Sequence, residues 1–337
     1  MLEILSGQKS GTPRYTGSPP LATISSQYLG RAYGTCTLQG TSLMVSGGFA
    51  APANPYPSNF RVLTLSQDGL STTTSISVTG NDGTGAVSFQ MNDTAWIGMG
   101  NDGGYFRYIR VRNPITGALT LTTSNSPAVG QGYVKIAKYD SDRLFWGYGL
   151  GASGWTKDAY TYRISNNTWA ALPSYPEEYG LVYGQFISQN LPDGRILIGF
   201  SDSLHSLIFF NPQTNQYSSS APLTGIIDNA YLTNARLSPG TTATAVVGKY
   251  LLFFGQGFTQ ATSTILSCLR YDTETDKFSV IDFPTQAARW GARCVNDDSK
   301  QFLYLVGGLT QSGDVGPAAS VNKFNQALVY PFSQFLI

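Results

Sequence analysis

The first residues of this sequence that could carry chemistry are two glycine runs. Gly100-Asn-Asp-Gly103-Gly104 and Gly147-Tyr-Gly149-Leu-Gly151 each follow a segment with the pattern of a strand. Glycines that bind phosphate lead into a helix, whose first amide groups face the phosphate. No helical pattern of apolar residues follows either run. We therefore expect turns at both places, and no cofactor.

The single histidine of the chain is His205. A histidine-rich metal site needs several imidazole ligands, so none can be built within one chain, and no metal is expected. Asp202 and Ser203 stand beside His205, but the members of a Ser-His-Asp triad are recognised by geometry rather than by closeness in sequence. We interpret His205 as a loop histidine.

Two carboxylate pairs, Glu177-Glu178 and Asp297-Asp298, could in principle supply acid and base groups. Glycoside hydrolysis needs two carboxyl groups roughly 5–10 Å apart across a cleft. Adjacent residues of a strand point to opposite sides, so neither pair forms such a site alone. With no nucleophile, acid, base or metal cluster converging, the sequence predicts no catalytic residue and a protein that is not an enzyme.

Aromatic residues in expected loops are the remaining candidates. Exposed aromatic side chains can stack on sugars or anchor a protein interface. The predicted ligand- or partner-binding residues are Tyr56, Trp155, Tyr179, Phe258 and Trp290. Packing between neighbouring sheets explains each of them at least as well. Trp155 is the best candidate for exposure, because small and polar residues flank it.

The charge content and the first residues of the chain indicate which partners and which cellular compartment to expect. Charged residues make up 12% of the 337 residues and the formal net charge is +1, against roughly 25% charged residues in an average soluble domain. No basic patch is visible, so neither nucleic acid nor an anionic membrane is an expected partner. The first residues do not form a signal peptide, and no stretch is apolar enough to span a membrane. Synthesis in a cytoplasm follows as an expectation.

Six strand-like segments that end at glycine must position these residues. They are 42–48, 94–100, 144–149, 195–199, 250–255 and 302–308. From Gly47 to Gly307 there are 260 residues over five intervals, a mean of 52. A second landmark recurs with the same spacing. It is a strand followed by a turn rich in Asn, Asp, Gly and Pro and then by another strand, as at Asp272–Asp276.

Two cysteines occupy matching places in this pattern. Cys36 and Cys294 each lie five residues after an arginine and are expected at equivalent positions, as small buried residues or, if close enough, as a disulfide.

This pattern resembles the kelch repeat, in which a strand ending in Gly-Gly precedes a Tyr-Asp strand and a late aromatic residue, and whose period is close to 50 residues. The resemblance covers Tyr28 to Tyr330 and implies an all-β, six-bladed kelch-like β-propeller with four-stranded antiparallel blades. Full Gly-Gly pairs occur at 47–48 and 307–308, and Trp169 matches the late tryptophan. Kelch-fold copper oxidases carry two ligand histidines, and this chain has one.

The sixth repeat lacks its outermost strand, so the ring needs another segment to close. We predict that residues 1–24 supply that strand and that residues 25–337 form the propeller, with the N- and C-terminal segments paired. In the alternative, residues 331–337 make the strand, and the first 20 residues are a tail that docks on a partner.

Two functions fit these features. The first is a structural or attachment protein of a virus particle, a bacteriophage tail component that resides in the virion and contacts other virion proteins, copies of itself or the host surface through its loop faces. Few charges, an uncharged polar surface and the propeller domains known in phage tails motivate it. The alternative is a kelch-like module that binds a glycan or a protein through its loop aromatics.

Overall fold

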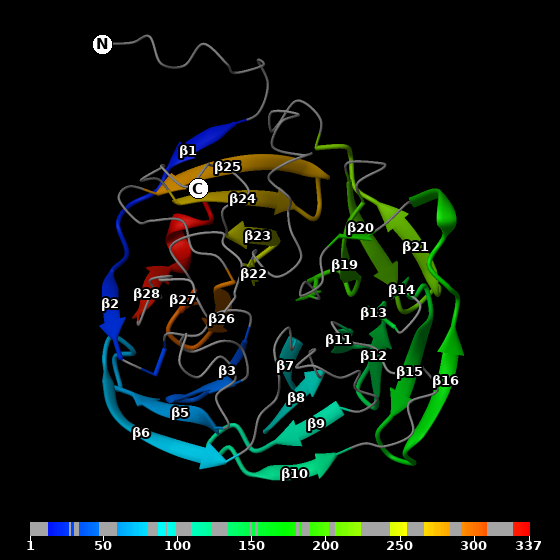
Figure 1. Ribbon diagram of the computed structural model, residues 1–337. Helices are drawn as coiled ribbons and strands as arrows, with labels where there is room; N and C mark the ends of the chain where they lie inside the picture. The colour runs from blue at the N-terminus through cyan, green and yellow to red at the C-terminus, as the bar shows by residue number, and fades with distance from the viewer. Residues whose placement is uncertain are drawn as a thin grey trace.

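In the computed structural model, the described residues are 13–26, 28–29, 34–46, 59–79, 87–91, 93–98, 109–122, 134–148, 150–151, 154–179, 182–183, 189–201, 206–223, 243–254, 266–283, 291–308 and 326–337. Their strands form six four-stranded antiparallel blades around a central axis (Figure 1). The predicted six-bladed all-β propeller is therefore confirmed.

Each blade runs from an innermost strand beside the axis to an outermost strand at the rim. In that order, blade 1 consists of β3 (Thr35–Gln39), β4 (Ser42–Ser46), β5 (Asn59–Leu65) and β6 (Thr72–Thr79), blade 2 of β7 (Val87–Met91), β8 (Thr94–Gly98), β9 (Ile109–Arg112) and β10 (Leu119–Thr122), and blade 3 of β11 (Lys135–Lys138), β12 (Arg143–Gly147), β15 (Ala159–Arg163) and β16 (Thr168–Leu172). Blade 4 consists of β18 (Gln189–Asn190), β19 (Ile196–Ser201), β20 (Ser206–Asn211) and β21 (Gln216–Ser219), blade 5 of β22 (Ala243–Val247), β23 (Tyr250–Phe254), β24 (Leu266–Asp272) and β25 (Lys277–Phe283), and blade 6 of β26 (Arg293–Asp297), β27 (Phe302–Val306), β28 (Gln326–Pro331) and β2 (Ala22–Ser25).

Smaller elements decorate this ring. A short hairpin joins β13 (Leu150–Gly151) and β14 (Gly154–Trp155), and β17 (Val182–Tyr183) pairs with the end of β19. Two 3-10 turns, η1 (Glu177–Tyr179) and η3 (Phe332–Gln334), follow blade 3 and blade 6.

The N-terminal segment closes the ring, as predicted. Strand β2 pairs antiparallel with β28 and is the outermost strand of blade 6, ending at Ser25, one residue beyond the predicted boundary. The alternative was wrong, because η3 occupies residues 332–334 and no ladder forms there. The structure adds a feature that we did not predict, since β1 (Arg14–Thr16) pairs parallel with the outer edge of β25 in blade 5.

Both sequence landmarks keep a constant place in the blades, the first in all six and the second in blades 1 to 5. Each glycine-ended segment is the second strand from the axis, and the polar turns connect the third strand to the fourth. All five turns hold one residue at positive φ, and these are Gly69, Gly117, Asn167, Asn215 and Asp276. Glycine, and after it Asn and Asp, occupy that conformation at the least steric cost, which explains the composition of the turns.

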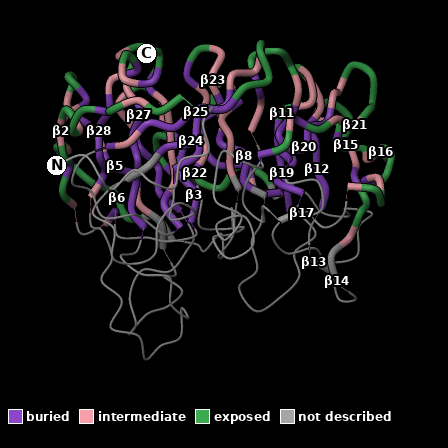
Figure 2. Tube along the Cα trace, turned by 90° about the horizontal axis from the view of Figure 1, so that it is seen from above, coloured by how far each residue is buried: buried purple, intermediate pink, exposed green. Residues whose placement is uncertain are grey.

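Buried apolar side chains fill the spaces between neighbouring blades. Figure 2 shows the buried residues along the inner parts of the blades and exposed residues along the turns and the outer strands. Between blades 2 and 3, for example, Trp96 and Trp146 are buried, and Trp169 meets Trp146 edge-on at a ring-centroid distance of 5.9 Å. Each blade therefore has two apolar faces, and each depends on the next blade to cover them.

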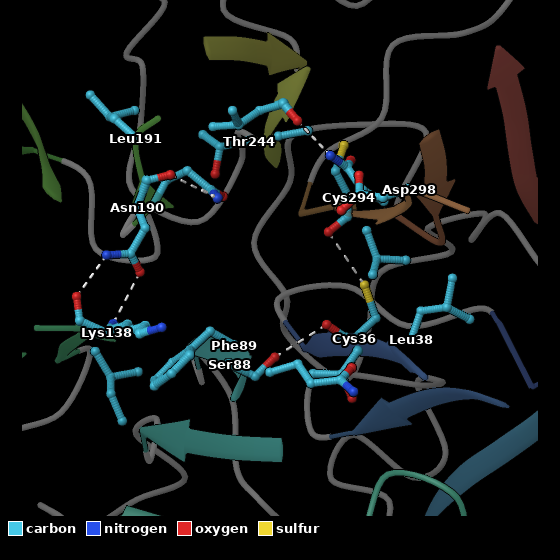
Figure 3. A pocket seen from close by; sticks show the side chains of 18 of the residues that line it. Cys36, Leu38, Ser88, Phe89, Lys138, Asn190, Leu191, Thr244, Cys294 and Asp298 are labelled. Atoms are coloured by element: carbon cyan, nitrogen blue, oxygen red, sulfur yellow. Dashed lines mark hydrogen bonds between the residues drawn. The ribbon is translucent and has the colours of Figure 1, made fainter. Parts of the chain in front are cut away.

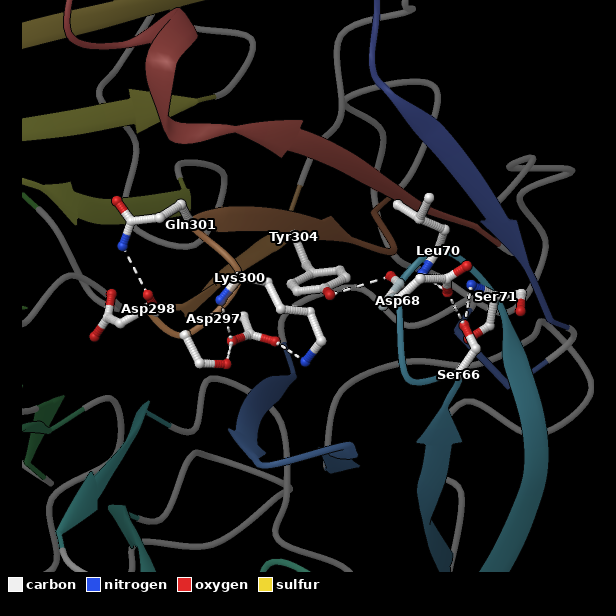
Figure 4. A network of polar contacts seen from close by, with 11 residues as sticks. Ser66, Asp68, Leu70, Ser71, Asp297, Asp298, Lys300, Gln301 and Tyr304 are labelled. Carbon is white, nitrogen blue, oxygen red and sulfur yellow. Dashed lines mark hydrogen bonds and ion pairs between the residues drawn. The ribbon is translucent and has the colours of Figure 1, made fainter.

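A hydrogen bond from strand β27 of blade 6 reaches a turn of blade 1, and polar contacts within each blade's turn lie on either side of it (Figure 4). The Tyr304 hydroxyl donates to the carbonyl of Gly69 at 3.1 Å. Lys300 Nζ lies 2.6 Å from Asp297 Oδ2. Hydrogen bonds from Ser66 and from the Leu70 amide, with a smaller effect of Lys300, hold the pKa of Asp68 below its ordinary value. These contacts stabilise the interface between blade 6 and blade 1, at which the ring closes.

One turn residue offers a direct test of backbone strain. Gln301 has φ 56°, a left-handed conformation that costs a non-glycine residue roughly 1 kcal/mol. Gln301→Gly is expected to raise the free energy of unfolding by about 0.5–1 kcal/mol, measured by urea denaturation. The matched control is Gly248→Gln, at φ 57°, which should lower the free energy of unfolding. Both Gln301→Gly and Gln301→Ala remove the hydrogen bond from Gln301 Nε2 to the Asp298 carbonyl, so no gain of Gln301→Gly over Gln301→Ala would show that the turn is not strained.

Candidate functional site

The innermost strands of the six blades surround a cavity of about 690 Å³ on the axis (Figure 3). Eight of its twenty lining residues have uncharged side chains with hydrogen-bonding groups, and these are Thr37, Ser88, Gln90, Tyr139, Gln189, Asn190, Thr244 and Asn296. Two lining residues carry charge, Lys138 and Asp298, and they lie on opposite sides of the cavity. Such a lining suits water or a neutral polar ligand.

Hydrogen bonds between adjacent blades hold the cavity wall in place. Ser88 Oγ donates to the carbonyl of Cys36 at 3.2 Å, which joins blades 1 and 2. The Asn190 side chain accepts from the Lys138 amide at 3.0 Å and donates to the Lys138 carbonyl at 2.7 Å, which joins blades 3 and 4. Because these side chains bind the backbone of the neighbouring strand, the cavity has a preformed shape.

The thiols that face this region are free and inert. Cys36 and Cys294 lie on equivalent innermost strands, as predicted, and Cys36 Sγ donates to the Cys294 carbonyl at 3.7 Å. No disulfide joins them. Burial raises the pKa of the Cys36 thiol to about 12, so the group stays protonated at neutral pH and is a poor nucleophile. The third thiol, Cys268, is fully buried on β24, the third strand of blade 5.

A second candidate lies where blades 3 and 4 meet, around the hairpin β13–β14 and η1. Tyr175 donates its amide to the Lys157 carbonyl at 2.9 Å, and Lys157 Nζ lies 2.7 Å from Glu177 Oε1. The rings of Tyr175 and Tyr179 meet edge-on at 5.8 Å. These contacts bring the segment that follows Trp155 beside the segment that carries Tyr179, and we call this region the blade 3–4 corner.

Sequence reasoning missed the tyrosines beneath this corner. Tyr148 and Tyr175 are buried, and each meets Tyr217 edge-on. The hydroxyls of Tyr148 and Tyr217 are hydrogen-bonded, and burial raises the pKa of Tyr217 to about 12. Tyr148 has φ 52°, an uncommon conformation for a bulky residue. Three separate segments supply these rings, so no spacing in the sequence indicated the cluster.

The five predicted binding residues have different outcomes. Tyr56, Phe258 and Trp290 lie outside the described residues. The backbone of Trp155 belongs to β14, and its side chain lies outside the description as well. Tyr179 is half-buried and packs against the apolar cluster between blades 3 and 4. The structure therefore brings the Trp155 hairpin and Tyr179 to one corner, and exposure of the rings of Trp155, Tyr56, Phe258 and Trp290 stays a prediction.

The carboxylate pairs are engaged in separate contacts. Glu177 forms the ion pair with Lys157, and Asp297 forms the ion pair with Lys300. In the part of the chain that the structure describes, no group of three or more His, Cys, Asp or Glu residues could hold a metal ion. Across the same residues, no helix has the length and apolar character needed to cross a membrane. His205 lies outside the described residues.

Comparisons with known proteins do not add a family to this picture. No protein-family model matches the chain, and no curated protein is similar to it at a significant level. What the chain does must therefore be inferred from its own residues and its propeller fold.

Proposed function

We propose that this chain is a non-enzymatic binding protein that works through one face of its propeller. The observation that carries the proposal is the contrast between the two faces. On one face the strands are joined by short turns such as 40–41 and 248–249, and other turns of this face accept hydrogen bonds from a neighbouring blade, as Gly69 does from Tyr304 and Pro212 from Tyr139. On the other face the connections are as long as 220–242 and 307–325. Binding residues concentrate on long loops that a rigid scaffold positions.

Within this proposal, the most specific role is an attachment protein of a virus particle, of the kelch-like kind found in bacteriophage tails. The low charge of the chain and the absence of charged residues from five outer strands, β2, β6, β10, β16 and β21, support a surface that packs against other proteins. Its partners would be other virion proteins, copies of itself or the host surface, and its location would be the virion.

Quantitative mass spectrometry of purified particles from the source of the gene tests this role. The chain is expected at a fixed ratio to the major structural protein, and it should remain after the particles are washed in high salt. Recovery of the chain only in the soluble fraction, with none in the particles, would contradict a virion role and leave the binding face to be tested separately.

The blade 3–4 corner favours a second candidate, a module that binds a glycan or a protein. Trp155→Ala at this corner, and Tyr56→Ala in the connection between β4 and β5 of blade 1, are each expected to weaken binding on a glycan array or to a captured protein by about tenfold or more, because truncating a central aromatic anchor costs roughly 1–3 kcal/mol. The melting temperature should not change if both side chains are exposed.

Ile115→Ala is the matched control for these two variants. Ile115 is an exposed apolar residue in a turn on the opposite face, so its truncation should leave binding unchanged. If the two aromatic variants bind as well as the unmodified chain, these aromatics are not the site.

A further inference from the structure

The outer edge of blade 1 is unusually open to pairing. Strand β6 spans Thr72–Thr79, eight residues with the sequence TTTSISVT, which contains no charge and no proline. Residues 73–77 are exposed, and the ladder of β6 joins it only to β5 among the described strands. Edge strands are normally protected by charges, proline, bulges or a cover, because their free backbone groups can pair with another chain.

The other outer strands carry such protection or are short. Strand β25 is covered by β1, which pairs along its free edge. A register shift opposite Arg112 interrupts β10 in the middle of its four residues. Strand β6 has a register shift too, but it lies near the start of the strand, at Thr73, and the pairing of residues 74–79 with β5 is regular. The remaining outer strands, β2, β16 and β21, span four or five residues. Blade 1 therefore presents the longest uncovered edge of the described ring, and blade 5 shows that a blade of this protein accepts a fifth strand.

Exposed apolar side chains gather on the same side of the ring. Seven large apolar residues are exposed among the described positions, and four of them belong to blades 1 and 2. These four are Ile76 at 52%, Ile115 at 50%, Leu119 at 50% and Leu121 at 45%. Blades 1 and 2 are neighbours, and β6 and β10 follow one another along the rim in Figure 1. The open edge thus lies beside an apolar surface.

We propose that two copies of this chain associate by antiparallel pairing of β6 with β6 around a twofold axis near Ile76. The two four-stranded blades would become one eight-stranded sheet. A second copy is the favoured occupant, because pairing two identical uncharged edges brings no like charges together. A charged peptide would find no complementary group along β6. This inference does not depend on the proposed function.

The register that centres the axis on Ile76 gives the central residues suitable partners. Ile76 lies opposite its own copy, and Ser75 lies opposite Ser77 of the other copy. Ile76 already pairs with Val62 of β5, so the two copies of Ile76 extend a row of β-branched apolar residues across the interface. Cross-strand pairs of such residues stabilise a sheet.

Analytical ultracentrifugation over a range of micromolar concentrations tests the pairing. The unmodified chain is expected to be in monomer–dimer equilibrium. Ile76→Lys and Ile76→Glu should each weaken dimerisation by about 100-fold or more, because like charges then face each other across the axis. An equimolar mixture of the two variants should dimerise again, since opposite charges now meet. The control is Leu21→Lys, at a position of equal exposure on the N-terminal segment, which should dimerise like the unmodified chain.

Three results would overturn the proposal. One is an unmodified chain that stays monomeric over the whole concentration range. Another is a dimer that survives Ile76→Lys but disappears on deletion of residues 1–12, which would assign the association to that segment. The third is a mixture of the two charge variants that stays monomeric although circular dichroism shows both to be folded.

Discussion

Deletion of residues 1–25 is expected to lower the free energy of unfolding by about 3–5 kcal/mol. The deletion removes β1 and β2, including Ile24, which is 2% exposed. Burial of such a side chain contributes roughly 2–3 kcal/mol, and each ladder hydrogen bond contributes about 1 kcal/mol. The cost of ordering the segment offsets part of this sum. Urea denaturation measures the difference.

The deleted strands also make specific contacts that explain why the loss should be large. Arg14 Nη2 lies 2.6 Å from Asp282 Oδ2, and the Gly17 amide donates to the Asp282 carbonyl at 2.7 Å. The guanidinium carbon of Arg270 lies over the ring of Tyr15, 4.6 Å from the ring centroid. The same guanidinium donates a hydrogen bond to the carbonyl of Phe335. Arg270 thus ties both ends of the described chain to blade 5.

Two controls separate ring closure from a general effect of truncation. Deletion of residues 1–12 removes none of these contacts and should leave stability unchanged. A synthetic peptide of residues 13–26, added to the deletion variant, should raise its melting temperature, whereas a scrambled peptide should not. A deletion variant as stable as the full chain would show that the N-terminal strands do not hold the ring together.

Replacement of Lys135 by methionine is expected to stabilise the protein at neutral pH by roughly 1–4 kcal/mol. Lys135 is 2% exposed on β11, and its Nζ has no hydrogen-bond partner among the described residues. Burial lowers the pKa of this amine well below its ordinary value. A buried ammonium without a partner is costly, so an apolar side chain of similar length should fit better.

The pH dependence of this gain has a defined sign. Because the pKa of Lys135 is depressed in the folded state, the unfolded chain binds more protons between that pKa and about 10.4. The stability of the unmodified chain therefore rises with pH through this window. The advantage of Lys135→Met should be greatest at neutral and lower pH and should shrink as the pH approaches about 10.4.

Lys138→Met is the matched control, because Lys138 lies on the same strand but is exposed. Its effect should stay within about 0.5 kcal/mol at every pH. Chemical denaturation of both variants at several pH values gives the comparison. Destabilisation by Lys135→Met would mean that Nζ has a partner in a segment outside the described residues.

The periodic parts of the fold could be predicted from the sequence because their causes are local. A strand that ends at glycine and a turn that needs positive φ each depend on a few adjacent residues, as Asn215 and Asp276 show. Six copies of the same local signals fixed the number of blades. The missing outer strand of the sixth repeat then required a strand from the N-terminal segment, and β2 is that strand.

The candidate sites could be predicted only in part, because they depend on residues that are distant along the chain. Trp155 and Tyr179 were recognised from their loop positions, but their placement at one corner depends on the contacts of Lys157. The axial cavity takes its lining side chains from all six innermost strands, and no single strand reveals it.

The amino-acid sequence alone predicted the repeat, the blade count, the turns and the need for a closing strand, since each follows from local backbone preference and strand patterning. Only the tertiary structure decided that β1 would cover β25, that Lys135 would be buried without a partner among the described residues, and that β6 would be left open. Those outcomes depend on which surfaces meet after the blades have packed, and the packing of one blade on the next is not encoded in either segment by itself.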